Sequence, residues 1–313
     1  MRVGILGATS EIAKDLILSF SKNHEVSLHL FARNPEKVIS WLAQVDLLSR
    51  YVVDEFAKFG NQDFDAIINF VGVGNPAQTA IMGSSIFEVT SKYDDLACAY
   101  ISTHLNCKYI FLSSGAAYGS SFDVPVDAET KATVAINNLQ PQDWYASAKL
   151  YAECQHRSLM HLSIIDIRVF NYFSSTQDMN ARFLITDIMR AINDKTLLKV
   201  SSHNTYRDYL HPSDFYQLVC KILAAPKTNI ALDCYTQAII DKFSLLKMMH
   251  DKFGLRYEFS VANNVVNSTG NKPHYYSLNR RAADFGYLPT LTSEEGVLQE
   301  VDKIIQKQIT SLA

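Results

Sequence analysis

Long hydrophobic runs, basic clusters and paired cysteines are all absent from this chain of 313 residues. No stretch approaches the roughly 20 uninterrupted apolar residues that a membrane-spanning helix needs. The 29 basic and 32 acidic residues nearly balance, and no dense block of lysine or arginine marks a nucleic-acid surface. These absences argue against membrane insertion and against nucleic acid as a partner.

Cysteine is scarce and scattered. The five cysteines contain no CxxC pair, so each fits a filler of apolar space better than a member of a disulfide framework or a zinc site. The first apolar run, residues 1–7, is too short for the core of a signal peptide and lacks a small-residue cleavage site. We therefore expect a cytoplasmic protein without a metal site.

Short apolar runs alternate with amphipathic stretches over the first half of the chain. This pattern predicts an α/β fold, a Rossmann-type doubly wound parallel sheet covered by helices. The run at 65–71 is apolar on both faces, as a central parallel strand should be. Ile12, Leu16, Ile17 and Phe20 have the spacing of a first helix. Strands are expected at 3–6, 26–31, 51–53, 65–71, 108–114 and 163–170.

The rhythm changes after about residue 173, where longer helical stretches alternate with short strands and polar turns. We interpret this part as a smaller C-terminal α/β substrate lobe that closes over the ends of the sheet. The expected dinucleotide-binding domain is 1–172 with crossing segments near 205–240, and the substrate-binding lobe is 173–204 with 241–313. Helices are expected at 181–192, 215–223, 243–252 and 292–308.

The turn after the first strand reads Gly7-Ala8-Thr9-Ser10-Glu11-Ile12-Ala13. A phosphate-binding turn needs glycine where the backbone bends sharply, and Gly7 meets that need. Ser10 and Ala13 stand where two further glycines normally do, and both are small. The N-terminus of the following helix would supply N–H groups and a positive dipole end. Taken alone, the motif is equally compatible with an ordinary tight turn.

The end of the second strand bears on the choice of cofactor. NAD-binding proteins usually place a carboxylate there for the ribose 2′-hydroxyl. This chain has no carboxylate at 30–34 but has Arg33, which can pair bidentately with a 2′-phosphate. The sequence thus favours NADP, with NAD possible. The alternative is that Arg33 is a solvated loop charge.

Tyr145 and Lys149 lie one helical turn apart, on the same face of an expected helix. A phenol has a pKa near 10, and a neighbouring ammonium stabilises the phenolate. Because the chain has 16 tyrosines, one such pair could arise by chance. The fifth strand supplies the context, because it ends in Ser113 and Ser114, and hydroxyls at that edge of a parallel sheet face the ligand crevice. The alternative is that both serines are ordinary polar residues at a strand end.

Together these residues resemble the extended short-chain dehydrogenase/reductase family of NAD(P)-dependent nucleotide-sugar epimerases, dehydratases and reductases. The resemblance runs nearly the whole length of the chain and rests on several motifs in the same order. They are the Gly7 turn, Asp54, residues 69–72, residues 113–119, the Tyr145/Lys149 pair, Ile167-Arg168-Val169-Phe170-Asn171, residues 206–214, and residues 277–289 with 294–296.

The resemblance implies roles by position. Ser114, Tyr145 and Lys149 would be catalytic; Ser114 would also touch the substrate, while Tyr145 and Lys149 would also touch the cofactor. The other implied cofactor contacts are Gly7, Thr9, Ser10 and Ile12 at the pyrophosphate, Arg33 at the 2′-phosphate, Asp54 near the adenine, and Asn69, Phe70, Val71 and Gly72 beside the ribose.

The resemblance also implies contacts with the substrate and with a second copy of the chain. Asn171 and Arg207 would meet the diphosphate of a nucleotide-sugar substrate. The rival interpretation of Arg207 is a structural pair with Asp208 or Asp214. A homodimer is expected, formed through the segments near 86–101 and 145–159.

The residues after Ser114 narrow the reaction. Gly115 and Ala116 stand where nucleotide-sugar 4,6-dehydratases carry an acid/base pair, and Ala116 also stands where the 3,5-epimerase/reductases that make GDP-fucose carry a cysteine. The leading hypothesis is therefore an NADP-dependent reductase of a nucleotide-activated 4-keto sugar. The alternatives are an NAD-dependent nucleotide-sugar 4-epimerase and, from another class, a non-catalytic NADP-binding sensor or scaffold.

Overall fold

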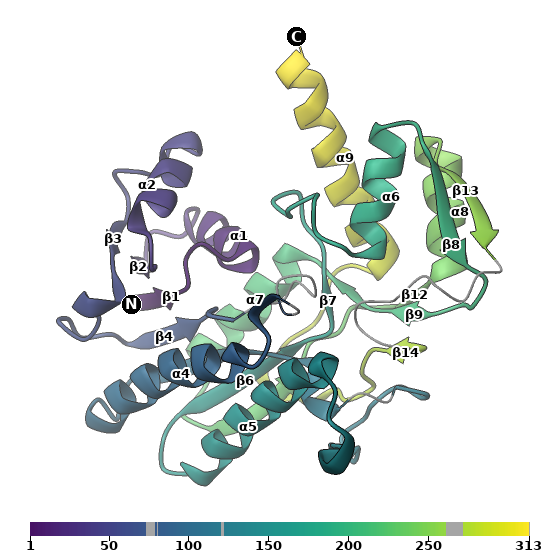
Figure 1. Ribbon diagram of the computed structural model, residues 1–313. Coiled ribbons are helices and arrows are strands. Elements are labelled where there is room, and N and C mark those ends of the chain that lie inside the picture. Colours follow the sequence, from purple (N-terminus) through teal and green to yellow (C-terminus); the bar gives the residue numbers. More distant parts are fainter. Residues whose placement is uncertain (73–78, 80, 120–121, 261–271, 313) are drawn as a thin grey trace.

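A seven-stranded sheet runs through the larger part of the molecule in the order β11-β6-β5-β4-β1-β2-β3 (Figure 1). This computed structural model describes residues 1–72, 79, 81–119, 122–260 and 272–312. Every neighbouring pair of strands in the sheet is parallel. Strand order reverses between β1 and β4, and open α/β sheets bind ligands at such a switch point. The strands are β1 (Arg2–Leu6), β2 (Ser27–Phe31), β3 (Val52–Asp54), β4 (Ala66–Asn69), β5 (Lys108–Ser114), β6 (Ile164–Val169) and β11 (Asn229–Asp233).

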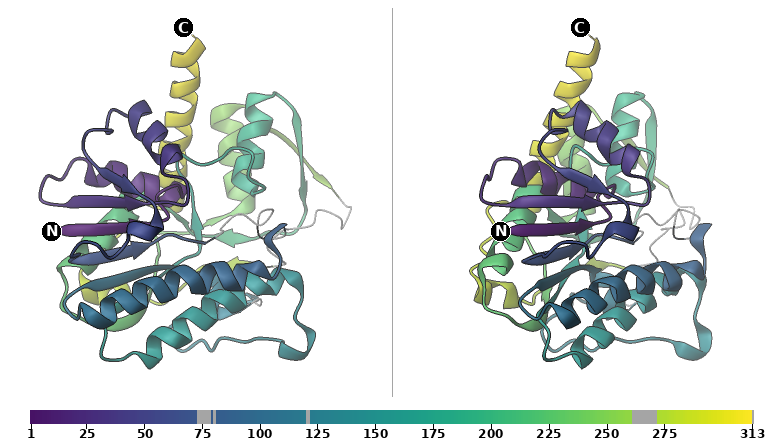
Figure 2. Two further views of the ribbon diagram at one scale, coloured as in Figure 1. Left: turned by 60° about the vertical axis from the view of Figure 1, so that its left-hand side comes forward. Right: turned by 90° about the vertical axis from the view of Figure 1, so that its left-hand side faces the viewer.

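Successive side chains of each strand point to opposite faces of the sheet, so its apolar residues contribute to two cores, one on each face. Ile5 and Ile68 pack with helices α1, α2 and α7. Ile67 and Phe111 pack with α4 and α5, which lie side by side (Figure 2). Burial on both faces explains why the central strands are apolar throughout. These helices are α1 (Glu11–Phe20), α2 (Pro35–Gln44), α4 (Ser85–Thr103), α5 (Trp144–Ser158) and α7 (Pro212–Ala224).

A third core lies in the C-terminal part, where Ile188, Leu246 and Val301 pack together. Its helices are α6 (Leu184–Asn193), α8 (Lys242–Phe253) and α9 (Ser293–Leu312). Its short strands are β7 (Asn171–Tyr172) with β10 (Tyr209–Leu210), β8 (Leu197–Ser201) with β13 (Arg256–Ser260), and β12 (Ile240–Asp241), β9 (Tyr206–Arg207) and β14 (His274–Tyr275) in one sheet. Single 3₁₀ turns are η1 (Phe56–Lys58), η2 (Gly115–Tyr118), η3 (Ile136–Asn138), η4 (Pro141–Asp143) and η5 (Arg281–Phe285).

The predicted doubly wound α/β fold is confirmed, and each expected strand of the sheet is present with small shifts at its ends. The seventh strand, β11, was not among the expected ones. Its apolar core is only Ile230-Ala231-Leu232, and it joins the edge of the sheet by parallel pairing with β6. Within the described ranges, no helix is long and apolar enough to cross a membrane.

The turn that follows β1 depends on glycine for two separate reasons. Gly7 has a φ of +81°, and a Cβ at this position would lie 2.9 Å from the backbone nitrogen of Val71. Gly254, which ends α8, has a φ of +71° but has no atom within 4 Å of its Cβ position. The two glycines therefore share the conformational requirement, and only Gly7 adds a steric one.

This difference gives a matched test. Gly254→Ala should cost about 1 kcal/mol of unfolding free energy, because an L-residue enters the left-handed region. Gly7→Ala should cost roughly 2–4 kcal/mol, because a backbone clash is added to the same conformational strain. Denaturant unfolding of both variants measures the gap, and equal losses would contradict the packing described for Gly7.

Candidate active site

The turn between β1 and α1 brings the expected diphosphate residues to the end of β4. The backbone after β4 packs directly against Gly7, where a Cβ would lie 2.9 Å from the nitrogen of Val71. Ser10 precedes α1 as its N-cap, and its hydroxyl makes no capping hydrogen bond. Thr9 is exposed on the turn, whereas Ile12 packs against the core of the sheet. The N–H groups of Gly7, Ala8 and Ser10 donate to backbone carbonyls, so the N–H groups of the first turn of α1 and its dipole are what this turn offers to an anion.

The ends of β2 and β3 place Arg33 and Asp54 differently. Arg33 is exposed just beyond β2. Asp54 is the last residue of β3 and contacts Lys58 Nζ at 2.6 Å and His29 Nε2 at 2.9 Å. The hydrogen bond from Lys58, with that of His29, lowers the pKa of Asp54. The Asp54 carboxylate is thus already paired with Lys58 and His29 of the same chain.

The end of β4 is fixed by its asparagine. Asn69 Oδ1 accepts the N–H of Val71 at 2.8 Å, and its Nδ2 donates to the hydroxyl of Tyr109 at 2.9 Å. The N–H of Phe70 donates to the carbonyl of Leu6. A methyl group at the exposed Gly72 would lie 3.4 Å from Lys149 Nζ. The structure therefore brings the expected ribose-side residues to the expected catalytic lysine.

Lys149 is 4% exposed, on the side of α5 that faces the sheet. Its Nζ donates to the carbonyl of Leu112 at 2.7 Å and lies 4.2 Å from the centre of the Phe111 ring and 6.0 Å from that of Tyr145. Burial lowers the pKa of Lys149 to about 8, although nearby carboxylates raise it. Because this pKa is close to neutrality, a small change in burial or in the nearby charges changes the fraction of Lys149 that is protonated.

Ser114 and Tyr145 lie together at the end of β5. Burial raises the pKa of the Tyr145 hydroxyl, and a hydrogen bond with Ser114 opposes that rise. Ser114 Oγ also accepts the N–H of Ala116 at 3.2 Å and contacts the hydroxyl of Tyr275 at 3.2 Å. The serine thus contacts the phenol of Tyr275 on β14 and influences the pKa of the phenol of Tyr145 on α5.

Sequence reasoning missed Tyr275. Its ring lies 6.0 Å from the Arg207 guanidinium and 4.8 Å from Lys272 Nζ, and burial raises the pKa of its hydroxyl. The residue stands in an aromatic run just before Ser277, where the resemblance to the family resumes. That run is the only sequence signal that could have pointed to it.

The two expected substrate-binding residues lie beside Tyr275. Asn171 Nδ2 donates to the carbonyl of Tyr275 at 3.3 Å. Arg207 donates to the carbonyls of Tyr206 and Lys272, each at 2.8 Å, and burial lowers its pKa.

The rival pairing of Arg207 is not formed between the described side chains. Asp208 accepts from Thr236 Oγ1 at 2.5 Å, and Asp214 accepts from Thr290 Oγ1 at 2.7 Å. Burial and the charge of Arg207 also lower the pKa of Lys272 to about 8. Arg207 and Lys272 therefore form a partly buried cationic pair beside Tyr275, an arrangement that suits an anion.

Comparisons with known proteins show which family and which folds the chain is similar to. The sequence model of the family described as "NAD dependent epimerase/dehydratase family" matches residues 3–234. A search of curated proteins finds no match.

Solved structures resemble the fold over nearly its whole length. UDP-glucuronic acid 4-epimerase from Bacillus cereus, in complex with UDP-glucuronic acid and NAD, has a TM-score of 0.78 at 16% identity, covering 98% of this chain and 99% of that one. UDP-glucose 4-epimerase from Thermotoga maritima, with UDP-glucose, has 0.79 at 14%, covering 99% and 100%. dTDP-glucose 4,6-dehydratase from Bacillus anthracis, in complex with NAD, has 0.77 at 16%, covering 98% and 97%. At these identities the likeness is one of fold.

The buried charge of Lys149 predicts a pH-dependent stability difference. Its pKa falls from 10.5 to about 8 on folding, so below pH 8 the folded state carries a cost of about 3 kcal/mol. Between pH 8 and 10.5 the unfolded state binds more protons, so that cost disappears as pH rises. Lys149→Met should therefore unfold with a higher free energy than the parent at neutral pH, and the gap should narrow above pH 8. Denaturant titrations across pH measure it, and a gap independent of pH would refute the assigned charge state.

Proposed function

The chain belongs to the NAD dependent epimerase/dehydratase family, and within this family we propose that it is an NADP-dependent reductase of a nucleotide-activated 4-keto sugar. The observation that carries the proposal is the grouping of Tyr145, Ser114 and Lys149. The serine lies close enough to the phenol to oppose the rise of its pKa, and the buried ammonium, one helical turn further along α5, lies 6.0 Å from the centre of the phenol ring. The expectation of an extended short-chain dehydrogenase-type oxidoreductase is confirmed at the level of the family.

The charge states suit proton donation to a carbonyl oxygen. Burial raises the pKa of Tyr145, so its hydroxyl is protonated at neutral pH and can act as the acid. Ser114 would hold the same substrate oxygen by a hydrogen bond. Lys149 would stabilise the phenolate left after proton transfer, since its ammonium faces the Tyr145 ring. When bound, the reduced nicotinamide would supply the hydride.

The packing after β5 supports reduction over dehydration. A Cβ at Gly115 would lie 2.3 Å from Cδ1 of Phe170, so this position has no room for an acidic side chain. The methyl of Ala116 is buried and carries no proton to transfer. Chemistry limited to hydride transfer with Tyr145 as acid/base is what these residues support.

Arg33 supports NADP as the cofactor. It is exposed beyond β2, on a strand end that has no carboxylate to repel a 2′-phosphate. The second candidate function is an NAD-dependent nucleotide-sugar 4-epimerase, which would oxidise and re-reduce its substrate with the same catalytic residues. It is supported by the resemblance in fold to two 4-epimerases, one of them in complex with NAD.

The cationic pair supports a nucleotide-sugar substrate. Arg207 and Lys272 would pair with the diphosphate, and the amide of Asn171 would donate a hydrogen bond to it. Correspondingly, we propose that 1–172 with the crossing segments near 205–240 binds the dinucleotide, and that 173–204 with 241–313 binds the substrate.

Two further parts of the proposal concern assembly and location. A homodimer would form through α4 and α5, which pack together on one face of the sheet. Sedimentation at micromolar concentration measures the oligomeric state. All five cysteines are free thiols, which supports the reducing cytoplasm.

A Tyr145→Phe variant tests the enzyme directly. It should lose roughly 100- to 10,000-fold of the NADPH oxidation driven by nucleotide-4-keto-sugars, because the positioned acid is removed. Tyr151→Phe is the matched control, since Tyr151 lies on the same helix and is 56% exposed. Full activity in Tyr145→Phe would contradict the proposal, and no activity with any nucleotide-keto-sugar would favour a sensor or scaffold.

Denaturing the purified protein and identifying the released nucleotide separates reductase from epimerase. An empty site that accepts NADPH is the expected result. Stoichiometric NAD in the released fraction would overturn the reductase in favour of the 4-epimerase.

A further inference from the structure

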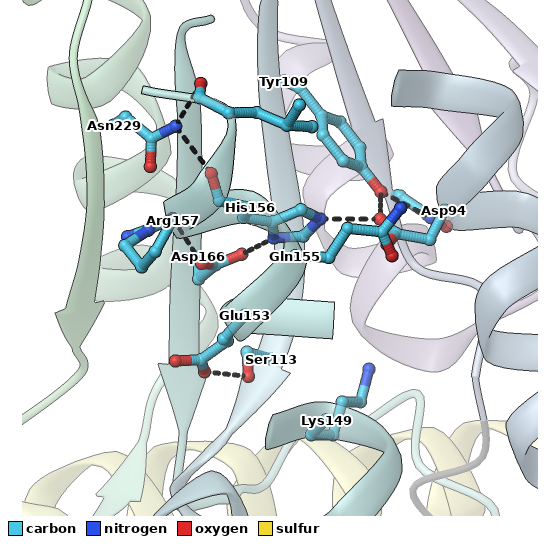
Figure 3. Close-up of polar contacts among 12 residues, drawn as sticks. Asp94, Tyr109, Ser113, Lys149, Glu153, Gln155, His156, Arg157, Asp166 and Asn229 are labelled. Carbon is cyan, nitrogen blue, oxygen red and sulfur yellow. Dashed lines mark hydrogen bonds and ion pairs between the residues drawn. The ribbon is translucent and has the colours of Figure 1, made fainter. Parts of the chain in front are cut away.

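Buried polar side chains of α4, β5, α5 and β6 form a chain of hydrogen bonds and ion pairs (Figure 3). At its centre His156, on α5, is fully buried. Its Nδ1 lies 2.6 Å from Asp166 Oδ1 on β6, and its Nε2 lies 2.9 Å from Asp94 Oδ1 on α4. One imidazole ring thus joins three elements of the fold.

The chain continues from Asp94 to the cofactor side of the sheet. The hydroxyl of Tyr109 donates to Asp94 Oδ1 at 2.7 Å and accepts from Asn69 Nδ2 at 2.9 Å. Asn69 in turn holds the N–H of Val71. An unbroken series of hydrogen bonds therefore links His156 to the residues expected beside the ribose.

At its other end, beyond Asp166, the chain of hydrogen bonds reaches the protein surface at Arg157. Arg157 Nη2 donates to Asp166 Oδ2 at 2.7 Å, and the Arg157 side chain is 33% exposed. The charged groups of the chain are thus two carboxylates, one guanidinium and one imidazole, and their charges cancel when the imidazole carries its second proton.

Both ring nitrogens of His156 face carboxylate oxygens, and only an imidazolium donates from both. Burial alone would lower the pKa of His156, but hydrogen bonds to Asp166 and Asp94 raise it to about 12. The ring is therefore a fixed cation throughout the physiological range.

This cation is linked to Lys149 through the carboxylates that both of them interact with. Of the groups that face Lys149, Leu112 and Phe111 on β5, Gly72 after β4 and Tyr145 on α5 are uncharged. The charged groups that raise its pKa are Asp94 from α4, Glu153 from α5 and Asp166 from β6. Two of these three are the partners of His156. Asp94 Oδ2 is buried and has no hydrogen-bond partner among the described residues, so its charge is only partly satisfied locally.

We propose that His156 is a positioning residue: clamped between Asp94 and Asp166, its imidazolium holds α5 against α4 and β6 and balances the carboxylate charge that Lys149 experiences. This inference rests on the proposed function only for the meaning of the Lys149 charge in catalysis. The arrangement itself is a property of the folded chain and is measurable without substrate.

The alternative to a proton between His156 and Asp94 is a bound metal ion. Ligand atoms of Asp94, Cys98 and His156 all lie within 4.8 Å of one another. The 2.9 Å contact between His156 Nε2 and Asp94 is the length of a hydrogen bond, which a proton fills. Metal analysis of the purified protein should therefore find no stoichiometric ion, and one equivalent lost on His156→Gln would overturn the proposal.

The charge balance is tested by two substitutions of opposite sign. Asp94→Asn removes a negative charge and should lower the proton affinity of Lys149, whereas His156→Gln removes a positive charge and should raise it, each by roughly tenfold. The measurement is the pH titration of the ε-carbon resonance of Lys149 by NMR, assigned by its loss in Lys149→Met.

The matched control is His211→Gln. His211 is another buried histidine paired with a carboxylate, Glu300, but it lies at the start of α7, away from α5. Its loss should leave the Lys149 titration unchanged. Shifts of the same sign in Asp94→Asn and His156→Gln, or none, would show that the chain only stabilises the fold.

Two safeguards keep the result decisive. If His156→Gln does not fold, ¹⁵N resonances of the parent protein still report the ring, which should stay doubly protonated to about pH 10; a neutral ring at pH 7 would overturn the proposal. The proposed function fails separately, through an active Tyr145→Phe enzyme, because the titration uses no substrate.

Discussion

The ammonium of Lys149 is the group around which the candidate site is built, because burying a cation is unfavourable unless its surroundings offset the lost hydration. The carbonyl of Leu112 accepts one of its protons at 2.7 Å, and the face of Phe111 lies 4.2 Å away. The carboxylates of Asp94, Glu153 and Asp166 supply the remaining compensation at longer range. Burial and these compensating contacts together give Lys149 a pKa of about 8. A group with a pKa this close to neutral pH is suited to act beside the phenol of Tyr145 in acid/base catalysis.

Glu153 also connects the same helix to the C-terminal part of the chain. It accepts from Ser113 Oγ at 2.5 Å and pairs with Arg168, which contacts Asp233 at 3.4 Å. Asp233 then accepts from Ser277 Oγ at 2.6 Å. Since Ser277 closely follows Tyr275, this series of contacts helps to set where that second phenol meets Ser114. The catalytic helix is therefore tied both to the sheet and to the segment that covers it.

Periodicity predicted the sheet because parallel strands buried on both faces must be apolar, and Gly7 marked its first turn because few residues tolerate that backbone. The pattern predicted Tyr145 and Lys149 from helical spacing and Ser114 from a strand end. It could not predict β11, whose apolar core is short, or Tyr275, which meets Ser114 across 161 residues of sequence. A two-residue strand leaves no period to detect, and such a contact is decided by tertiary packing.

The buried ionic chain escaped sequence reasoning for a different reason. Asp166 interrupts an apolar strand, and its partner His156 stands on a helix face that also carries buried apolar residues. Well-packed apolar side chains of similar volume usually stabilise a core as much as a buried ion pair does, and sometimes more. Hydrogen-bonded ion pairs differ from apolar packing because each hydrogen bond fixes an angle as well as a distance. A rotation of α5 would therefore break the contacts of His156 with both α4 and β6. A reaction that needs a phenol and an ammonium held at fixed positions beside a cofactor gains from that restraint, since errors of about 1 Å in placement cost on the order of 100-fold in rate.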